Sequence, residues 1–162
     1  MTSPFRRVVT GHDAAGRAVV TIDEQLTPTP IPSGDAAFAL IWTSPTLPVD
    51  NNDDTDGRTR PAGLTLHGGS VVRIVDMLPG GVSPMHRSNS LDYGVIMSGT
   101  VELELDDGAV TRLGPGDVVV QRGTIHAWRN PSADKPARIL FVLTEALPRL
   151  VDGAPLPEVH AG

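Results

Sequence analysis

The stretch VELELDDGAVTRL, residues 101–113, has the pattern of two short β-strands joined by a turn. Apolar residues in its first half alternate with Glu102 and Glu104, as they do in a strand with one buried and one solvent-exposed face. Asp107 and Gly108 then supply the positive φ angles that a tight hairpin turn needs. We therefore expect a β-hairpin at the centre of the chain.

The sequence on both sides of this hairpin also indicates β structure. Gly114-Pro115-Gly116 predicts a second reversal, and the continuous apolar run Val118 to Val120 after it is typical of a strand covered on both faces. No stretch sustains apolar residues at helical spacing over several turns. Strands are predicted at residues 18–22, 36–42, 70–77, 93–98, 100–106, 109–113, 117–121, 125–129 and 137–144. This order favours an all-β barrel or sandwich.

Composition narrows the possible functions. A chain of 162 residues can bury a core as one domain, and the absence of cysteine excludes disulfides, iron–sulfur clusters and thiol nucleophiles. The net charge of -6, with basic residues spread thinly, argues against a nucleic-acid partner. The first residues lack an apolar signal-peptide core, and nowhere is there an apolar run long enough to cross a bilayer. We expect a soluble, cytoplasmic protein whose partners are small molecules or other proteins, with no membrane association.

Two flanks differ from the centre. Residues 44–62 are rich in Pro, Asp and Asn, as long exposed loops are, and the tail 145–162 carries three prolines and is expected to lie over the surface or fray. Asn52, Asp54, Asp56 and Gly57 have the offsets of a calcium-binding loop, but Gly63 stands where a bidentate glutamate is required. A solvated acidic loop is the better interpretation. We divide the chain into an N-terminal extension (1–69), a core (70–144) and the tail (145–162).

Two spaced motifs carry the functional signal. The first reads G-x5-H-x-S-x3-D-x6-G from Gly80 to Gly99, and the second reads G-x2-H-x3-N from Gly123 to Asn130. Here the sequence resembles the cupin superfamily, whose first motif is G-x5-H-x-H-x3 or 4-E-x6-G and whose second is G-x5-P-x-G-x2-H-x3-N. The resemblance covers residues 70–144 and departs from the family pattern at three positions, Ser88 for the second histidine, Asp92 for glutamate and Gln121 for proline.

The resemblance implies a fold and a site. Cupins are double-stranded β-helices, which are jelly-roll-like barrels, and their ligands from both motifs point into one end of the barrel. Two histidines and one carboxylate are a recognised donor set for a divalent metal, and His86, Asp92 and His126 supply it. Such a set accepts iron, manganese, nickel, zinc or cobalt. The same three residues could instead line a metal-free pocket, or each could have only a structural role.

Three further residues are assigned to the substrate pocket. Ser88 is a poor direct ligand and is expected to hydrogen-bond a metal-bound water or to leave a position open for substrate. Trp128 shares a strand face with His126 and should form a wall of the cavity. Arg73 is a charge in an apolar strand face and would bind a substrate carboxylate or phenolate if that face lines the barrel. The alternative, slightly favoured from sequence alone, is that this face is exposed or that Arg73 pairs with Asp76 or another acid.

Three functions remain open. The leading hypothesis is a small metal-dependent enzyme, an oxygenase, decarboxylase or isomerase/lyase, that acts on a small oxygenated molecule, for example an aromatic or polyketide-like one. The motifs look like those of single-domain cupins that accompany secondary-metabolite or aromatic-degradation enzymes. A second hypothesis is a metal-free dehydratase, isomerase or cyclase that uses the same His and Asp residues as acid and base. A third is a non-catalytic binding module. Because cupins commonly pair through an N-terminal strand, we expect a homodimer that uses the strands at 18–22 and 36–42.

Overall fold

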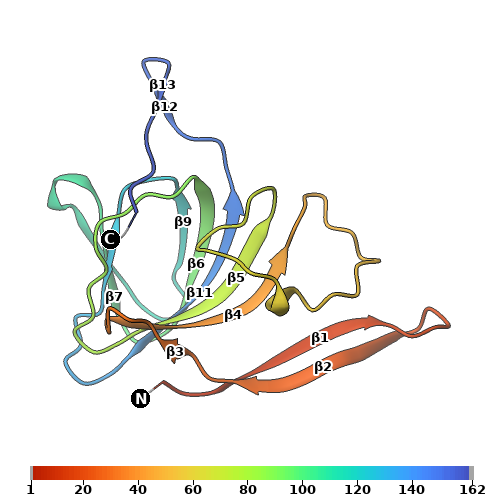
Figure 1. Ribbon diagram of the computed structural model, residues 1–162. Coiled ribbons are helices and arrows are strands. Elements are labelled where there is room, and N and C mark those ends of the chain that lie inside the picture. Colours follow the sequence, from red (N-terminus) through yellow and green to blue (C-terminus); the bar gives the residue numbers. More distant parts are fainter. Residues whose placement is uncertain (1, 161–162) are drawn as a thin grey trace.

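The computed structural model describes residues 2–160, and its regular secondary structure is almost entirely antiparallel strands (Figure 1). The larger sheet has six strands, in the spatial order β3 (Thr29–Pro30), β4 (Ala36–Ser44), β5 (Ser70–Met77), β11 (Ala137–Glu145), β6 (Ser90–Ser98) and β9 (Val118–Arg122). The smaller sheet has the order β10 (Ala127–Arg129), β7 (Val101–Glu104) and β8 (Val110–Leu113). The predicted all-β fold is confirmed.

The core lies between the inner faces of these two sheets. Val71, Ile139 and Ile96 enter it from the larger sheet, while Val101 and Trp128 enter it from the smaller one. Alternation along each strand places one apolar face inside and the other outside. The two sheets therefore form a barrel whose interior is closed mainly by aliphatic and aromatic side chains.

The central hairpin is present where the sequence predicts it. Strands β7 and β8 pair antiparallel, and Val101 and Leu103 of β7 are buried. The turn contains the short 3-10 segment η2 (Asp106–Gly108), in which Asp107 has φ 58° and Gly108 has φ 73°. These positive angles are the ones that the Asp-Gly pair was expected to supply.

The prediction that the run Val118–Val120 is covered on both faces is wrong. Val119 points toward the core, but the side chains of Val118 and Val120 are 61% and 55% exposed. The reason is the position of β9 at the edge of the larger sheet, where β6 is its neighbour and nothing within residues 2–160 covers the outer face.

The N-terminal region contributes both to the barrel and to an arm outside it. Strand β4 pairs with β5 of its own chain along its length and with β3 at Ala37 and Phe38. Strands β1 (Phe5–His12) and β2 (Ala18–Leu26) form a separate hairpin that extends beside the barrel (Figure 1). The sequence did not predict β1, because its charged residues and Gly11 obscure the alternation.

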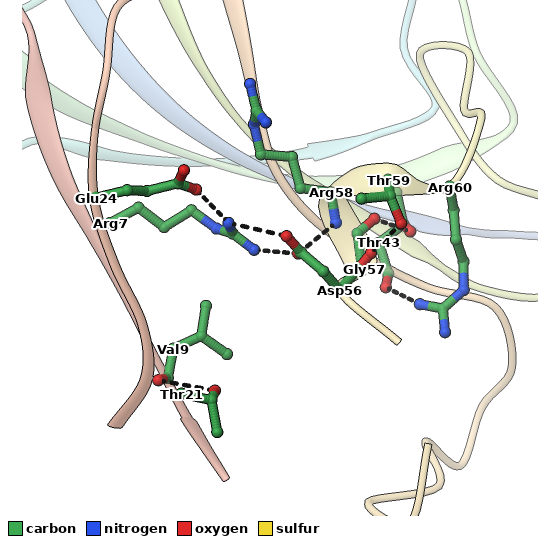
Figure 2. A network of polar contacts seen from close by, with 10 residues as sticks. All are labelled: Arg7, Val9, Thr21, Glu24, Thr43, Asp56, Gly57, Arg58, Thr59 and Arg60. Carbon is green, nitrogen blue, oxygen red and sulfur yellow. Dashed lines mark hydrogen bonds and ion pairs between the residues drawn. The ribbon is translucent and has the colours of Figure 1, made fainter. Parts of the chain in front are cut away.

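The arm is anchored to the acidic loop by one buried cation. Arg7 of β1 forms ion pairs with Glu24 of β2 and with Asp56 of the loop (Figure 2). Its guanidinium lies 5.7 Å from the centre of the Trp42 ring. Asp56 also accepts a hydrogen bond from the backbone N–H of Arg58 in the 3-10 segment η1 (Gly57–Thr59). The loop is therefore not the freely solvated segment that the sequence predicted. Asp56, which would be a ligand in the calcium-loop alternative, is instead paired with Arg7.

The tail also forms more structure than its prolines suggested. Strands β12 (Leu150–Val151) and β13 (Ala154–Pro155) make a small hairpin. Val159 then exchanges two backbone hydrogen bonds with Arg87, each 2.9 Å long, and Glu158 accepts from the backbone N–H of Asn89. The last described residues therefore pair with the chain segment that follows His86.

Within residues 2–160 there is no helix long and apolar enough to cross a membrane.

Candidate functional site

The two histidines of the motifs face each other across a β-bridge. The backbone N–H of each residue donates to the carbonyl of the other, and both of these hydrogen bonds are 2.9 Å long. This pairing places the imidazole rings side by side, with 4.1 Å between their centroids. His86 and His126 are therefore brought together as the motif spacing predicts.

Hydrogen bonds to backbone carbonyls fix the orientation of both rings. Nδ1 of His86 lies 2.9 Å from the carbonyl oxygen of Pro84, and Nδ1 of His126 lies 2.9 Å from that of Thr124. A carbonyl oxygen only accepts, so Nδ1 carries the proton in each ring. With the proton on Nδ1, the neutral form of each ring has its lone pair on Nε2, the arrangement found in histidines that bind metals.

Asp92 and Gln121 come from the opposite sheet. They are directly paired across β6 and β9, so their side chains share the inner face, and each is only 5% exposed. The side-chain amide nitrogen of Gln121 donates to Oδ2 of Asp92 at 2.9 Å and lies 3.1 Å from Nε2 of His126. The site is thus built at the junction of the two sheets, with Gln121 joining the carboxylate to the histidine.

The sequence did not identify Gln121 as a site residue. In the sequence it is visible only as a departure from the family pattern at a proline position. Its period-2 relation to Val119, which also faces the core, was the available signal. Recognising it required the pairing of β9 with β6, which brings residues 29 positions apart into hydrogen-bonding contact.

Burial changes the acid–base properties of the site. Burial, together with the nearby charge of His86, lowers the pKa of His126 to about 4 and outweighs the hydrogen bond to Thr124. Burial also raises the pKa of Asp92, despite the opposing influence of neighbouring hydrogen-bond donors and of His86. His126 is consequently a neutral lone-pair donor near neutral pH.

These groups open into a cavity of about 100 Å³ whose remaining lining is mostly apolar. Ser88, Trp128 and Arg73, the three residues assigned to the pocket from sequence, all line it. Trp128 points to the same side as His126, as predicted, and its ring meets that of Phe141 edge-on at 5.5 Å between centroids. Leu64, Val75, Met77, Ile139 and Leu143 complete much of the apolar wall.

Arg73 corrects the interpretation that the sequence slightly favoured. Its strand face is not exposed but lines the cavity, and Arg73 does not pair with Asp76. Asp76 lies on the other face of β5, where it accepts two hydrogen bonds from Arg138. Because residues 73 and 76 are three apart on one strand, they point to opposite sides of the sheet.

The donor set fits a divalent metal once the Gln121 amide is reoriented. Within residues 2–160, no three His, Asp or Glu side chains lie close enough together to hold an ion as the side chains now stand. However, Oδ1 of Asp92 and Oε1 of Gln121 are both buried without a hydrogen-bond partner in that range. A half-turn of the Gln121 amide exchanges its nitrogen and oxygen and would leave only electron-pair donors around the histidines. Two imidazoles, a carboxylate and an amide oxygen suit a divalent cation.

The comparisons with known proteins agree with this fold. The family model described as a cupin domain matches residues 73–143. A protein named phomopsin biosynthesis cluster protein C' from Diaporthe leptostromiformis is 44% identical over 155 residues, which cover 91% of this chain and 82% of that protein. The cupin-domain-containing oxidoreductase srdB of Neurospora crassa is 38% identical over 160 residues, which cover 96% and 81% of the two chains.

A solved structure resembles the barrel as well. It is that of a conserved protein with a double-stranded β-helix domain from Klebsiella pneumoniae, with a TM-score of 0.51 and 19% identity over 72% of this chain and 81% of that one. At this identity the likeness concerns the fold alone.

Proposed function

The chain belongs to the cupin superfamily, and from this premise we propose that it is an enzyme acting on a small oxygenated molecule in the barrel cavity. The observation that carries the proposal is the convergence of His86, His126, Asp92 and Gln121 in an otherwise apolar cavity. Buried polar groups of this kind cost stability unless they are paired, so their presence favours a functional role. Relatives named as cupin-domain-containing oxidoreductases and biosynthesis cluster proteins support an enzyme of secondary metabolism.

The proposal includes a divalent metal held by His86, His126 and Asp92, with Gln121 as a further oxygen donor. When bound, such an ion would supply Lewis-acid or oxygen-activating chemistry. The metal would be iron, manganese, nickel, zinc or cobalt, and elemental analysis would identify it. The orphaned oxygens of Asp92 and Gln121 are the structural support for this part of the proposal.

The protein itself prepares the site in three ways. The carbonyls of Pro84 and Thr124 hold both Nε2 lone pairs toward the cavity. The apolar wall excludes water, which strengthens every electrostatic interaction inside. Trp128 offers a flat surface for a planar substrate, and Ser88 offers a hydroxyl at the cavity lining.

Elemental analysis of the purified protein, prepared without chelator, tests the metal. We expect near-stoichiometric metal in the parent protein and little in a His86→Ala, His126→Ala double variant. The matched control is a His12→Ala, His67→Ala double variant, which removes two imidazoles that lie outside the cavity lining. A parent protein that stays empty after incubation with Fe(II), Mn(II), Ni(II), Co(II) and Zn(II) would refute the metal site.

A metal-free enzyme is the second candidate, and the electrostatics of the site favour it over a simple binding module. Asp92 has a raised pKa and is linked through Gln121 to a neutral His126, so the cavity holds a potential proton donor beside a potential acceptor. Such a pair could serve an isomerisation, dehydration or cyclisation. Turnover that is unaffected by removal of all metal would select this candidate.

We also infer a homodimer, formed through the exposed apolar side chains outside the barrel. The outer face of β6 and β9 carries two pairs of cross-strand neighbours, Tyr93 with Val120 and Val95 with Val118. Of these, Tyr93, Val118 and Val120 are exposed. The neighbouring Met97 and Val20 on the β1–β2 hairpin are exposed as well. Apolar surface of this kind is common at contacts between protein chains.

A further inference from the structure

We propose that Arg73 binds an acidic oxygen of the substrate, so that the cavity selects small aromatic acids or phenols in their anionic form. The proposal rests on the proposed function, because it names the substrate class of the same cavity. It starts from the position of Arg73, which lines the cavity and is only 8% exposed. A guanidinium in such a place must be compensated, since removing a charge from water is costly.

The protein supplies only part of that compensation. Within residues 2–160 the side-chain hydrogen bonds of Arg73 all come from Nη2, which donates to the backbone carbonyls of Gly63 and Leu64. Nε is buried without a partner, and no carboxylate in that range lies within ion-pair distance of the guanidinium. The Phe38 ring, 5.6 Å away, offers its π face but no negative charge. Burial accordingly lowers the pKa of Arg73.

Arg7 and Arg138, whose side chains are largely covered, show what compensation looks like in this fold. Arg7 lies between two carboxylates, and Arg138 forms two hydrogen bonds with Asp76. Neither of these arginines lines the cavity. Arg73, which lines the cavity, has no such anion within residues 2–160, and this is the arrangement expected if the ligand provides it.

The register of the larger sheet places Arg73 apart from His86 and His126. On β11, Phe141 is the direct cross-strand partner of Arg73 of β5 on one side and of Gly94 of β6 on the other. A Cβ atom at Gly94 would approach the Phe141 ring to 3.0 Å, so glycine leaves room for that ring over β6. A flat ligand can therefore rest against Phe141 and Trp128 with its anionic group at Arg73 and its other end toward His86 and His126.

Isothermal titration calorimetry at mildly alkaline pH tests the selection with three probes of similar size. Benzoate carries a carboxylate, 4-nitrophenolate a phenolate, and benzamide is neutral. We expect at least one anion to bind about ten-fold or more tightly than benzamide, the range of a charge-assisted hydrogen bond. The anion that binds tighter identifies the preferred acidic group. Equal affinity for benzamide and both anions, or no binding of either anion at millimolar concentration, would overturn the proposal.

Two variants separate Arg73 from the net charge of the protein. Arg73→Met keeps an unbranched chain at the buried position and should abolish the preference for the anion. Arg112→Met removes an exposed arginine of β8 that does not line the cavity and should preserve it. Persistence of the preference in Arg73→Met would refute the assignment. If Arg73→Met does not fold, the comparison of anions with benzamide in the parent protein still decides.

The outcome is distinguishable from failure of the proposed function. Anion binding that depends on Arg73, in a protein without turnover, would keep this inference and remove the enzymatic role. Metal binding or turnover without any preference for anions would do the reverse.

Discussion

At the scale of single residues, Gln121 connects groups that would otherwise be unsatisfied in the barrel interior. Its amide nitrogen serves both a buried carboxylate and a buried imidazole. A buried acceptor that loses its donor costs about 1–3 kcal/mol. The side chain therefore matters for stability as well as for the proposed site.

We predict that Gln121→Leu lowers the free energy of unfolding by about 1–3 kcal/mol, measured by urea denaturation. Arg122→Leu, on the exposed face of the same strand, should change it by less than about 0.5 kcal/mol. A cycle with Asp92→Leu should show a coupling energy of about 0.5–3 kcal/mol between positions 92 and 121. Strictly additive effects would mean that the hydrogen bond between them is not formed.

Gly57 shows how one residue allows the acidic loop to approach the barrel. A Cβ atom there would lie 2.6 Å from both the carbonyl oxygen of Thr43 and the Trp42 ring, so only glycine fits. We predict that Gly57→Ala destabilises the fold by about 1–3 kcal/mol, the range for overpacking. Gly114→Ala is the control, because nothing lies within 4 Å of a Cβ at that position. Thermal unfolding of both variants measures the difference, and equal melting temperatures would contradict the close approach.

At the scale of elements, a buried ion-pair network joins the β1–β2 arm to the acidic loop. Arg7 is buried between Glu24 and Asp56, and the apolar side chains Val8, Val19 and Val20 of the arm are exposed. An isolated two-stranded hairpin is marginally stable in water. The ion pairs of Arg7 therefore help to hold the arm in position.

This dependence predicts a response to acid. Burial by itself would raise the pKa of Asp56, but hydrogen bonds from Arg7 and Arg58, together with their charges, lower it. The folded state then binds the proton less readily than the unfolded state, whose pKa is about 4. The stabilising contribution is complete above that pH and is lost as the pH falls through the lower pKa of the folded state.

We predict that Asp56→Asn reduces stability by about 1–3 kcal/mol near neutral pH and makes stability less sensitive to pH below about pH 4. Hydrogen exchange should be faster in β1 and β2 of this variant. Asp54→Asn, which changes the same charge at an exposed position, should resemble the parent protein. An unchanged pH profile in Asp56→Asn would refute the proposed anchor.

At the scale of the whole molecule, the exposed outer face of β6 and β9 leads to a test of assembly. Sedimentation equilibrium should give twice the 17.1 kDa of the chain. Val120→Glu places a charge on this face and should shift the protein toward the monomer, whereas Val110→Glu, at an exposed position on β8, should not. A parent protein that stays monomeric over a wide concentration range would contradict the homodimer.

The sequence by itself determined the β class, most strand positions, the central hairpin and the facing of His126 and Trp128. These depend on alternation, turn chemistry and motif spacing, which are local along the chain. The edge position of β9, the contact between Gln121 and Asp92, the anchoring of Asp56 by Arg7 and the uncompensated burial of Arg73 were decided only by the tertiary structure. Each depends on which distant strands become neighbours, and pairing across a barrel is set by the packing of the whole chain rather than by the residues beside each position.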